Sequence, residues 1–251
     1  MTPDELVVDV SQDWMLACDV QQRFMKGLGG AGAFLNYSGR CRQLRALGGD
    51  CYDFMPLSNH RLALVIGDAS GKSLAAALMI ANVQSSLRTA TMFAGDDLSA
   101  LLRVVSHQAY TSSLEDRYAT VFYGVFDPAT RRLRYVNAGH NPPVILRQDV
   151  SLESVEGSGA PVGMFQDSTY DEGIIQLHPG DFLIAYTDGV IESANQFGEE
   201  WGIDGLLNAA AGCAKRSEGA EHLVQSIFKS MDTFSGGHQS DDATLAVLRV
   251  R

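Results

Sequence analysis

Aspartates that follow apolar, strand-like runs are the residues of this chain best suited to chemistry. Asp stands beside Gly or another Asp in Gly48-Gly49-Asp50, Gly67-Asp68, Asp188-Gly189 and Asp241-Asp242, and Asp53 lies close to the first of these motifs. The apolar run 64–66 precedes Asp68, and the run 182–185 precedes Asp188. We therefore expect these carboxylates to lie on rigid elements at the mouth of the core.

Carboxylates gathered in one place raise each other's pKa, so such a cluster is unfavourable without a counter-charge. A hard divalent cation removes this penalty and prefers oxygen ligands. Neighbouring glycines let the backbone approach closely and let a carbonyl point at the ion. Two such ions about 4 Å apart can activate a water molecule and hold phosphate oxygens, without a Cys or His nucleophile.

Each motif alone also has a purely structural interpretation. A single Asp-Gly or Gly-Gly-Asp is usually a turn or loop, and Asp241-Asp242 could be a capping pair or solvated charge. Only the joint occurrence of these motifs, each at the edge of an apolar strand, favours a metal site.

Composition excludes several classes of function. The chain has 251 residues and a formal net charge of −11, with no basic block. This argues against nucleic acid or an anionic membrane as a partner. No apolar run approaches the ~20 residues of a membrane span, and residues 1–5 lack signal-peptide features. The four cysteines form no Cys-x-x-Cys pair and are expected to be ordinary thiols. We expect a soluble, cytoplasmic protein.

The hydrophobic pattern predicts one N-terminal helix and one larger domain. Residues 1–26 form the first unit, helical from residue 5, which could be a linker, a regulatory element or a dimerisation helix. Glycines in 27–32 end it, and 27–251 form the second unit. In that unit we expect strands over 33–38, 40–46, 61–66, 118–126, 132–138, 143–147, 173–177, 181–187 and 243–250, and helices over 74–92, 98–113, 203–214 and 219–233. Tight turns between strands favour an α+β fold of antiparallel sheets covered by helices.

Six motifs, in order along the chain, resemble the bacterial branch of the PPM (PP2C-type) serine/threonine phosphatases, the SpoIIE/RsbU-like branch. They are Gly48-Gly49-Asp50-Cys51-Tyr52-Asp53-Phe54, Ile66-Gly67-Asp68-Ala69-Ser70-Gly71-Lys72, Asn137-Ala138-Gly139-His140-Asn141, Pro179-Gly180-Asp181, Tyr186-Thr187-Asp188-Gly189-Val190-Ile191-Glu192 and Asp241-Asp242-Ala243-Thr244-Leu245. The resemblance covers roughly residues 15 to 250.

The resemblance implies an αββα sandwich of two antiparallel sheets flanked by helices. It implies hydrolysis of phosphoserine or phosphothreonine on a protein with two Mn²⁺ or Mg²⁺ ions. A small anti-sigma-factor antagonist, of the STAS type, is the expected substrate.

The resemblance also assigns roles to residues at matching positions. Asp68 is expected to bridge the two metals, with the carbonyl of Ala69 as a further ligand. Asp50 is expected to be a metal ligand on one side, and Asp188 and Asp241 are expected to hold the other ion. We expect Asp68, Asp50 and Asp188 to be the catalytic residues, whereas Asp53 and Asp242 are second choices that could instead orient ligands.

This chain departs from the family pattern at a few positions. Ser73 replaces a glycine after Gly71-Lys72, where it could cap the next helix, and Cys51 replaces an aromatic residue. No residue matches the phosphate-binding arginine of eukaryotic relatives, so the metals would carry more of the phosphate binding.

Two further residues of these motifs could each have either a functional or a structural role. His140 could transfer a proton to the leaving serine oxygen, or it could hold a turn between strands. Lys72 could reach a phosphate, or it could be a solvated lysine at a helix start.

Two other functions would also fit the sequence. A non-catalytic scaffold or regulatory binding module could keep the fold and serve as a sensor. A metal-dependent hydrolase of small phosphoesters or nucleotides could use the same aspartates.

Overall fold

Two antiparallel sheets form the centre of the computed structural model, which describes residues 3–25, 29–93, 96–113, 116–157, 159–214 and 219–251. The first sheet has the order β1-β2-β11-β10-β7-β8, formed by Gly30–Ala31, Leu35–Arg42, Ala243–Val250, Phe182–Tyr186, Val144–Leu146 and Leu152–Ser154. The second has the order β3-β4-β5-β6-β9, formed by Asp50–Pro56, Leu62–Ala69, Ala119–Asp127, Arg132–Ala138 and Gly173–Gln176.

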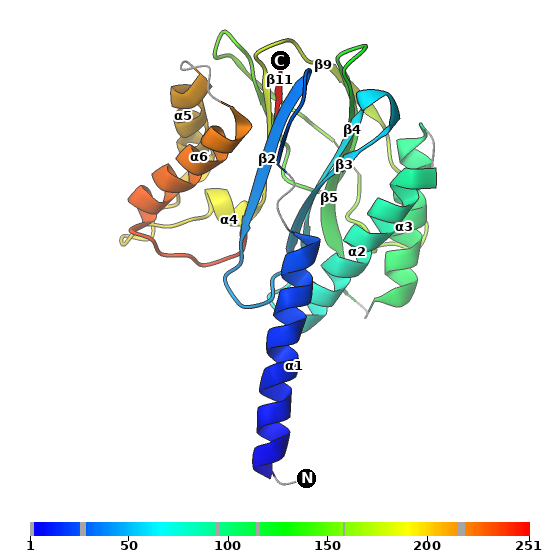
Figure 1. The fold of residues 1–251 in the computed structure, drawn as a ribbon, viewed down its shortest axis with the longest axis vertical. Coiled ribbons are helices and arrows are strands. Elements are labelled where there is room, and N and C mark those ends of the chain that lie inside the picture. The colour runs from blue at the N-terminus through cyan, green and yellow to red at the C-terminus, as the bar shows by residue number, and fades with distance from the viewer. Residues whose placement is uncertain (1–2, 26–28, 94–95, 114–115, 158, 215–218) are drawn as a thin grey trace.

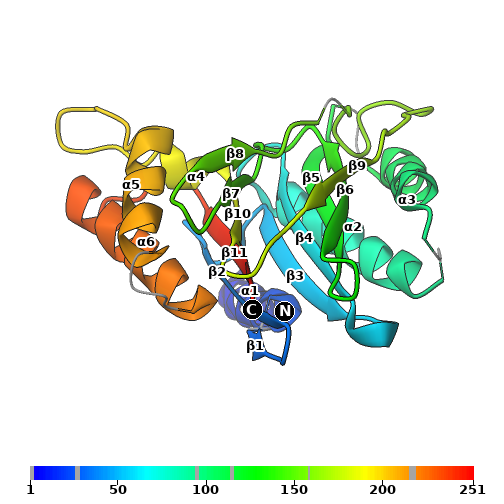
Figure 2. The same ribbon diagram turned by 90° about the horizontal axis from the view of Figure 1, so that it is seen from above.

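Helices cover the outer face of each sheet, as Figure 2 shows. The second sheet is covered by α2 (Leu74–Phe93) and α3 (Leu98–Ser112), and the first by α4 (Asp188–Ile191), α5 (Gly202–Ala214) and α6 (Ala220–Ser235). A short 3₁₀ helix, Ser58–His60, joins β3 to β4. The predicted αββα sandwich is therefore confirmed.

Strand alternation fills three separate cores. On β3, Tyr52 and Phe54 pack between the two sheets with residues such as Leu64 and Leu183. Cys51 and Met55, at odd positions of the same strand, face α2 and α3 instead. A third core joins the first sheet to α5 and α6. Because successive side chains of β3 face opposite sides of the sheet, only carboxylates at an even spacing on this strand can lie on the same face.

The N-terminal helix α1 (Pro3–Phe24) extends away from the sandwich, with only its C-terminal part against the sheets (Figure 1). Leu16, Val20 and Phe24, spaced by four residues, are 54%, 52% and 45% exposed. Gln21 is buried, and the side chain of Gln84 on α2 donates to the carbonyl of Phe24. The expected boundary at 26–27 lies outside the described residues. None of the described helices has the length and apolar character that crossing a membrane requires.

Most elements lie close to where the sequence places them, but some differ. The strands expected over 33–38 and 40–46 are one strand, β2, because Gly39 pairs with Ala246 without interrupting the ladder. Strands β1, β3 and β8 and helix α4 were not predicted. At the starts of β3 and α4, an aspartate with a neighbouring glycine gives a local pattern typical of a turn.

Candidate metal-binding active site

The sequence-predicted aspartates meet at one edge of the sandwich. Strand β3 begins at Asp50, and the neighbouring antiparallel strand β4 reaches Asp68 at the same edge. In the other sheet, β10 ends just before Asp188, and its neighbour β11 begins just after Asp241-Asp242. Antiparallel pairing thus places the start of one strand beside the end of the next, and this is how four distant segments converge.

Asp50 and Asp68 are direct cross-strand partners, so their side chains share the face that looks toward the other sheet. Asp50 is only 1% exposed. Its Oδ2 accepts hydrogen bonds from the hydroxyls of Thr187 at 2.8 Å and Thr244 at 2.6 Å. Both threonines belong to the first sheet or its edge, so they fix the orientation of Asp50 across the gap between the sheets.

Glycine 189 allows the segment of Asp188 to pack against the segment of Asp241 and Asp242. A Cβ at Gly189 would lie 2.0 Å from the carbonyl oxygen of Asp242 and 3.0 Å from the Cβ of Asp241. A side chain at 189 would therefore separate the two segments.

Asp242 binds backbone amides of the loop before β3. Its Oδ1 accepts from the amide of Leu44 at 2.6 Å, and its Oδ2 accepts from the amide of Gly49 at 2.7 Å. Its carboxylate is thus committed to holding the loop that precedes Asp50.

The backbone at Gly49 brings a carbonyl into the same group. A Cβ on Gly49 would lie 3.1 Å from the carbonyl oxygen of Ala69 and 3.6 Å from Oδ1 of Asp68. The amide of Ala69 also donates to the carbonyl of Gly49 at 3.0 Å. The Ala69 carbonyl and the Asp68 carboxylate therefore lie over the same glycine.

Burial and mutual repulsion raise the pKa values of the clustered carboxyls. Burial raises the pKa of Asp68 to about 7, with further contributions from the charges of Asp188 and Asp241. Burial, and then the charge of Asp68, raises the pKa of Asp50 well above its ordinary value, although its threonine partners act in the opposite direction. Burial also raises the pKa of Asp188, with the charge of Asp241 adding to the effect. This is the electrostatic pattern expected where a cation binds.

Lys72 pairs with one of these carboxylates. Its Nζ lies 2.6 Å from Oδ2 of Asp241 and donates to the carbonyl of Ser240 at 3.0 Å. The hydrogen bond to Asp241 raises the pKa of Lys72. Lys72 is thus neither free in solvent nor directed at an open phosphate position, because it neutralises part of the acidic cluster.

Asp53 lies away from the cluster. It is three residues beyond Asp50 on β3, so it faces the opposite side of the sheet, toward α2. Arg88 of α2 donates to both of its carboxylate oxygens at 2.8 Å. The structure thus commits Asp53 to a bidentate ion pair, and the odd spacing from Asp50 is the sequence signal that separates the two.

His140 has the environment of a structural residue. Its backbone amide donates to Oδ1 of Asn137 at 2.8 Å, and the Asn137 side chain donates back to the carbonyl of His140 at 3.0 Å. The ring is buried with Nδ1 3.0 Å from the hydroxyl of Thr120. Burial lowers the pKa of His140 to about 4, so the ring is neutral near pH 7 and has no proton to give a leaving group.

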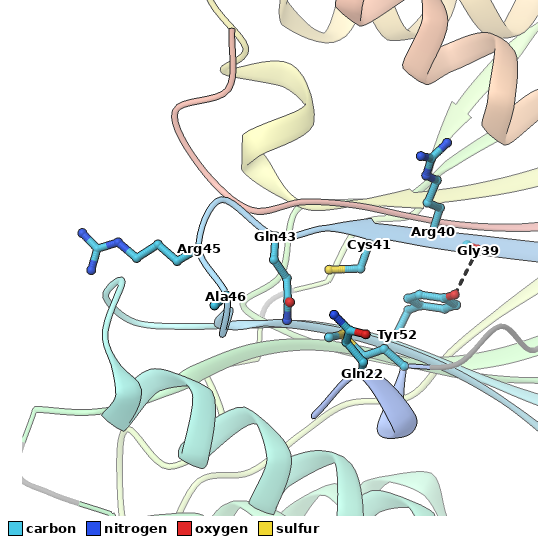
Figure 3. A pocket seen from close by; sticks show the side chains of 9 residues that line it. Gln22, Gly39, Arg40, Cys41, Gln43, Arg45, Ala46 and Tyr52 are labelled. Atoms are coloured by element: carbon cyan, nitrogen blue, oxygen red, sulfur yellow. Dashed lines mark hydrogen bonds between the residues drawn. The ribbon is translucent and has the colours of Figure 1, made fainter. Parts of the chain in front are cut away.

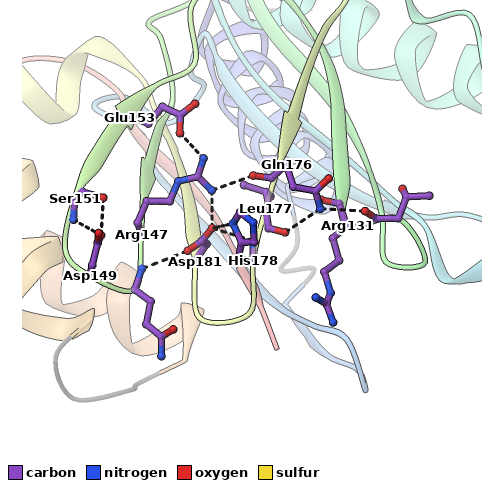
Figure 4. A network of polar contacts seen from close by, with 11 residues as sticks. Arg131, Arg147, Asp149, Ser151, Glu153, Gln176, Leu177, His178 and Asp181 are labelled. Carbon is purple, nitrogen blue, oxygen red and sulfur yellow. Dashed lines mark hydrogen bonds and ion pairs between the residues drawn. The ribbon is translucent and has the colours of Figure 1, made fainter.

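The Pro179-Gly180-Asp181 motif lies at the beginning of β10, the opposite end of that strand from Asp188. Arg147 donates to Asp181 at 2.6 Å, and Asp181 accepts from the amide of His178 at 2.9 Å (Figure 4). The same guanidinium contacts Glu153. This carboxylate therefore holds the turn that enters β10.

The C-terminal part of α1 contacts the loop that leads into Asp50. The side-chain amide of Gln21 donates to the carbonyl of Gly48 at 2.8 Å and accepts from the amide of Gly48 at 3.1 Å. The Gln43 side chain donates to the same oxygen of Gln21 at 2.9 Å. A hollow of about 490 Å³ lies beside this contact, lined by Gln22, Cys41 and Tyr52 among others (Figure 3).

Donor chemistry tests whether this site fits a metal. All the clustered groups offer oxygen, which suits Mg²⁺ or Mn²⁺. Within the described ranges, no three acidic, His or Cys side chains already stand in a coordinating arrangement. The Lys72–Asp241 ion pair holds one candidate ligand in another interaction. The residues present therefore fit divalent cations in type and charge, and the side chains must reorient to bind them.

The groups that hold the aspartates in place were not predicted from the sequence. Thr187 and Thr244 belong to motifs that were recognised, but only the aspartates of those motifs were assigned roles. A hydroxyl residue next to a buried carboxylate could have been identified from its position. Gln21 could not, since its partner Gly48 is 27 residues away.

The fold and the acidic edge together define a PP2C-fold domain. This chain is similar to the crystal structure of the RsbU and RsbW domains of Rv1364c from Mycobacterium tuberculosis, with a TM-score of 0.76 and 26% identity. The match covers 90% of this chain and 62% of that one. The SiaA-PP2C domain of Pseudomonas aeruginosa shares the fold with a TM-score of 0.80 and 17% identity, covering 99% of both chains. The catalytic domain of the serine threonine protein phosphatase PstP, solved in complex with 2 manganese ions, has a TM-score of 0.63 and 17% identity, covering 86% of this chain and 98% of that one.

The chain belongs to the Stage II sporulation protein E (SpoIIE) family, whose pattern it matches over residues 58–251. It is 28% identical to the phosphoserine phosphatase RsbU of Bacillus subtilis over 211 residues, which is 82% of this chain and 60% of RsbU. The chain spans between about a quarter and three fifths of the length of the curated relatives it matches. The resemblance to the SpoIIE/RsbU-like branch is confirmed.

Proposed function

We propose that this chain is a divalent-cation-dependent phosphatase that removes phosphate from serine or threonine of a protein. The observation that carries the proposal is the convergence of Asp50, Asp68, Asp188 and Asp241 at one edge, with raised pKa values for the first three. The family membership, the name of RsbU and the manganese of PstP support it.

In this proposal each residue at the edge has a defined role. Asp68, Asp50, Asp188, Asp241 and the carbonyl of Ala69 would hold the cations through their oxygen atoms. Asp241 would have to leave its ion pair with Lys72 to take part. Asp242 holds the loop before Asp50, and the threonine hydroxyls orient Asp50. Asp53 remains with Arg88.

The reaction we propose is direct attack of water on phosphorus. When bound, the two cations, Mn²⁺ or Mg²⁺, supply a hydroxide near neutral pH and offset charge on the phosphoryl oxygens. The oxygen of water bonds to phosphorus and gives up a proton to solvent, the bond from phosphorus to the serine or threonine oxygen breaks, and that oxygen takes a proton from solvent.

The side chains near the site do not favour a covalent phosphoenzyme. Burial, and then the charge of Asp50, raises the pKa values of the Cys41 and Cys51 thiols, which keeps both protonated. His140 is buried in a turn. If phosphate from a labelled substrate stayed on the denatured protein, direct attack would be wrong.

The substrate we propose is a phosphorylated anti-sigma-factor antagonist of the STAS type, in the cytoplasm. The similarity to RsbU and to the RsbU and RsbW domains of Rv1364c supports this class. The N-terminal helix α1, with its exposed apolar stripe, is proposed to act as a dimerisation and regulatory element.

Hydrolysis assays in Mn²⁺, in Mg²⁺ and in EDTA test the function. A phosphoserine protein and p-nitrophenyl phosphate should both be hydrolysed with either metal, and EDTA should stop the reaction. Turnover of small phosphoesters without any turnover of phosphoproteins would indicate a small-molecule hydrolase. A folded protein that binds Mn²⁺ and hydrolyses neither would indicate a non-catalytic scaffold.

A further inference from the structure

Two arginines from other segments contact the loop that follows Asp68 and Ala69, and this loop also contains a lysine. Arg117 donates to the carbonyl of Ser70 at 2.9 Å. Arg45 donates to the carbonyl of Lys72 at 2.7 Å. Lys72 itself reaches back to Asp241. Two carbonyls of this loop, those of Ser70 and Lys72, therefore each accept a hydrogen bond from an arginine, and the loop carries the charge of its own lysine as well.

Arg45 and Arg117 differ from Lys72 in having their charge available. Within the part of the chain that the structure describes, neither arginine forms an ion pair with a carboxylate, whereas Arg42, Arg61, Arg88, Arg134 and Arg147 all do. Each is held by one backbone carbonyl, which leaves further N–H donors of the guanidinium for another partner. Figure 3 shows the Arg45 side chain pointing away from the other labelled residues that line the hollow beside α1.

The position of Arg117 is set by the backbone around it. The amide of Ser70 donates to the carbonyl of Tyr118 at 2.9 Å, and the amide of Tyr118 donates to the hydroxyl of Ser70 at 3.2 Å. Gly71 has φ of +88°, and a Cβ there would lie 2.5 Å from Nη1 of Arg117. The guanidinium thus packs against a residue that has to be glycine, only three positions from Asp68.

The two arginines are positive groups beside an acidic site in a protein of strongly negative net charge. The formal net charge is −11 and the site itself is acidic, so an acidic protein segment would be repelled by most of the surface. Arg117 also borders a hollow of about 190 Å³ beside the exposed Leu78 of α2. A segment that crosses the site beside this loop would meet both guanidinium groups.

We propose that Arg45 and Arg117 select a phosphoprotein segment that carries Asp or Glu on both sides of the phosphorylated serine or threonine. This inference rests on the proposed phosphatase function and adds the sequence class of its substrate. The arginines act as specificity determinants, because they contact acidic flanking residues and leave phosphoryl chemistry to the aspartate edge.

Three phosphoserine peptides of equal length, with acidic, amide or lysine flanks, test the inference in Mn²⁺. Wild-type kcat/KM should be about tenfold higher for the acidic than for the amide peptide, because each of two exposed ion pairs should raise it about two- to fivefold. Arg45→Gln and Arg117→Gln should each lower this ratio, and the double variant should bring it close to one. High salt should lower the wild-type ratio in the same way.

A matched control and a charge reversal separate specificity from a structural effect. Arg132→Gln, at an exposed position at the far end of β6, should keep the wild-type ratio. Arg117→Glu should shift the preference toward lysine flanks, a result that mere misfolding would not produce. An acidic preference that is absent from the wild type or survives in the double variant would overturn the inference. Failure to hydrolyse any of the peptides, or any other phosphoprotein, would instead overturn the phosphatase function on which it rests.

Discussion

Asp50 and Asp68 lie directly opposite each other on the antiparallel strands β3 and β4. Cross-strand partners share a face, so both carboxylates point toward the other sheet. Asp50 is almost fully buried, and its charge could be tolerated there only with hydrogen bonds and a nearby cation. This pairing is the centre on which Asp188 and Asp241 converge from the other sheet.

Metal-free protein should lose stability as pH rises toward neutrality. Asp68 has a pKa raised to about 7 when folded, from 3.8 as the ordinary value. The stabilising contribution of its protonated form is complete below about pH 4 and is lost as pH rises through about 7, because the unfolded chain releases this proton first. The measurement is urea unfolding in EDTA from pH 4 to 8, where Asp68→Asn should show a weaker fall than the wild type. Parallel curves for the two proteins would contradict this assignment.

The hydroxyls of Thr187 and Thr244 should support metal binding through Asp50. Both donate to its Oδ2, so Thr187→Val or Thr244→Val should weaken Mn²⁺ binding by about tenfold. Isothermal titration calorimetry with Mn²⁺ measures the change. Thr233→Val, which removes a hydroxyl bonded within the exposed part of α6, serves as the control and should bind as the wild type does.

Gln21 should connect the N-terminal helix to the metal site. Its side-chain amide binds both backbone groups of Gly48, two residues before Asp50. Gln21→Ala should weaken Mn²⁺ binding severalfold and lower the free energy of unfolding by about 1–3 kcal/mol, because the Gly48 peptide loses its partners. Gln22→Ala, on the exposed neighbour, should do neither. Wild-type Mn²⁺ affinity in Gln21→Ala would show that the contact only anchors the helix.

The exposed stripe of α1 should hold two copies of the chain together. Leu16, Val20 and Phe24 recur every four residues and are about half exposed, which is the spacing of one helix face. Sedimentation velocity should find a dimer, and the double variant Leu16→Glu/Val20→Glu should be a monomer. Gln22→Glu lies on another face of the helix and should leave the dimer intact. A wild-type monomer at high protein concentration would rule out this role of the stripe.

The sandwich could be predicted from the sequence because long periodic segments such as α2 and β11 carry clear hydrophobic patterns. It could not predict β3, since Asp50 and Asp53 interrupt the apolar residues and the strand is buried on both faces. Asp50 and Asp53 are three residues apart on β3, so their side chains face opposite sides of the sheet. The ion pair of Asp53 with Arg88 shows that Asp53 lies away from the site.

The candidate site was predictable as a group of residue types but not as a set of contacts. Gly beside Asp indicated close backbone approach, and Gly49 and Gly189 both have neighbours that leave no room for a side chain. The partner of Lys72, in contrast, is 169 residues away, and no local pattern indicates an ion pair across that separation. His140 likewise needed the burial and the reciprocal bonds with Asn137 to be assigned to a turn.

An active site centred on Asp68 is tested most directly by Mn²⁺-dependent hydrolysis of a phosphoserine protein by the wild type, Asp68→Asn and Asp204→Asn. Asp204 is an exposed carboxylate in the first turn of α5, so its variant controls for the loss of one negative charge. We expect turnover by the wild type and Asp204→Asn, and a loss of at least about a hundredfold in Asp68→Asn, on the scale of losing one key electrostatic group of an active site. Equal turnover by folded Asp68→Asn and the wild type would contradict an active site centred on Asp68.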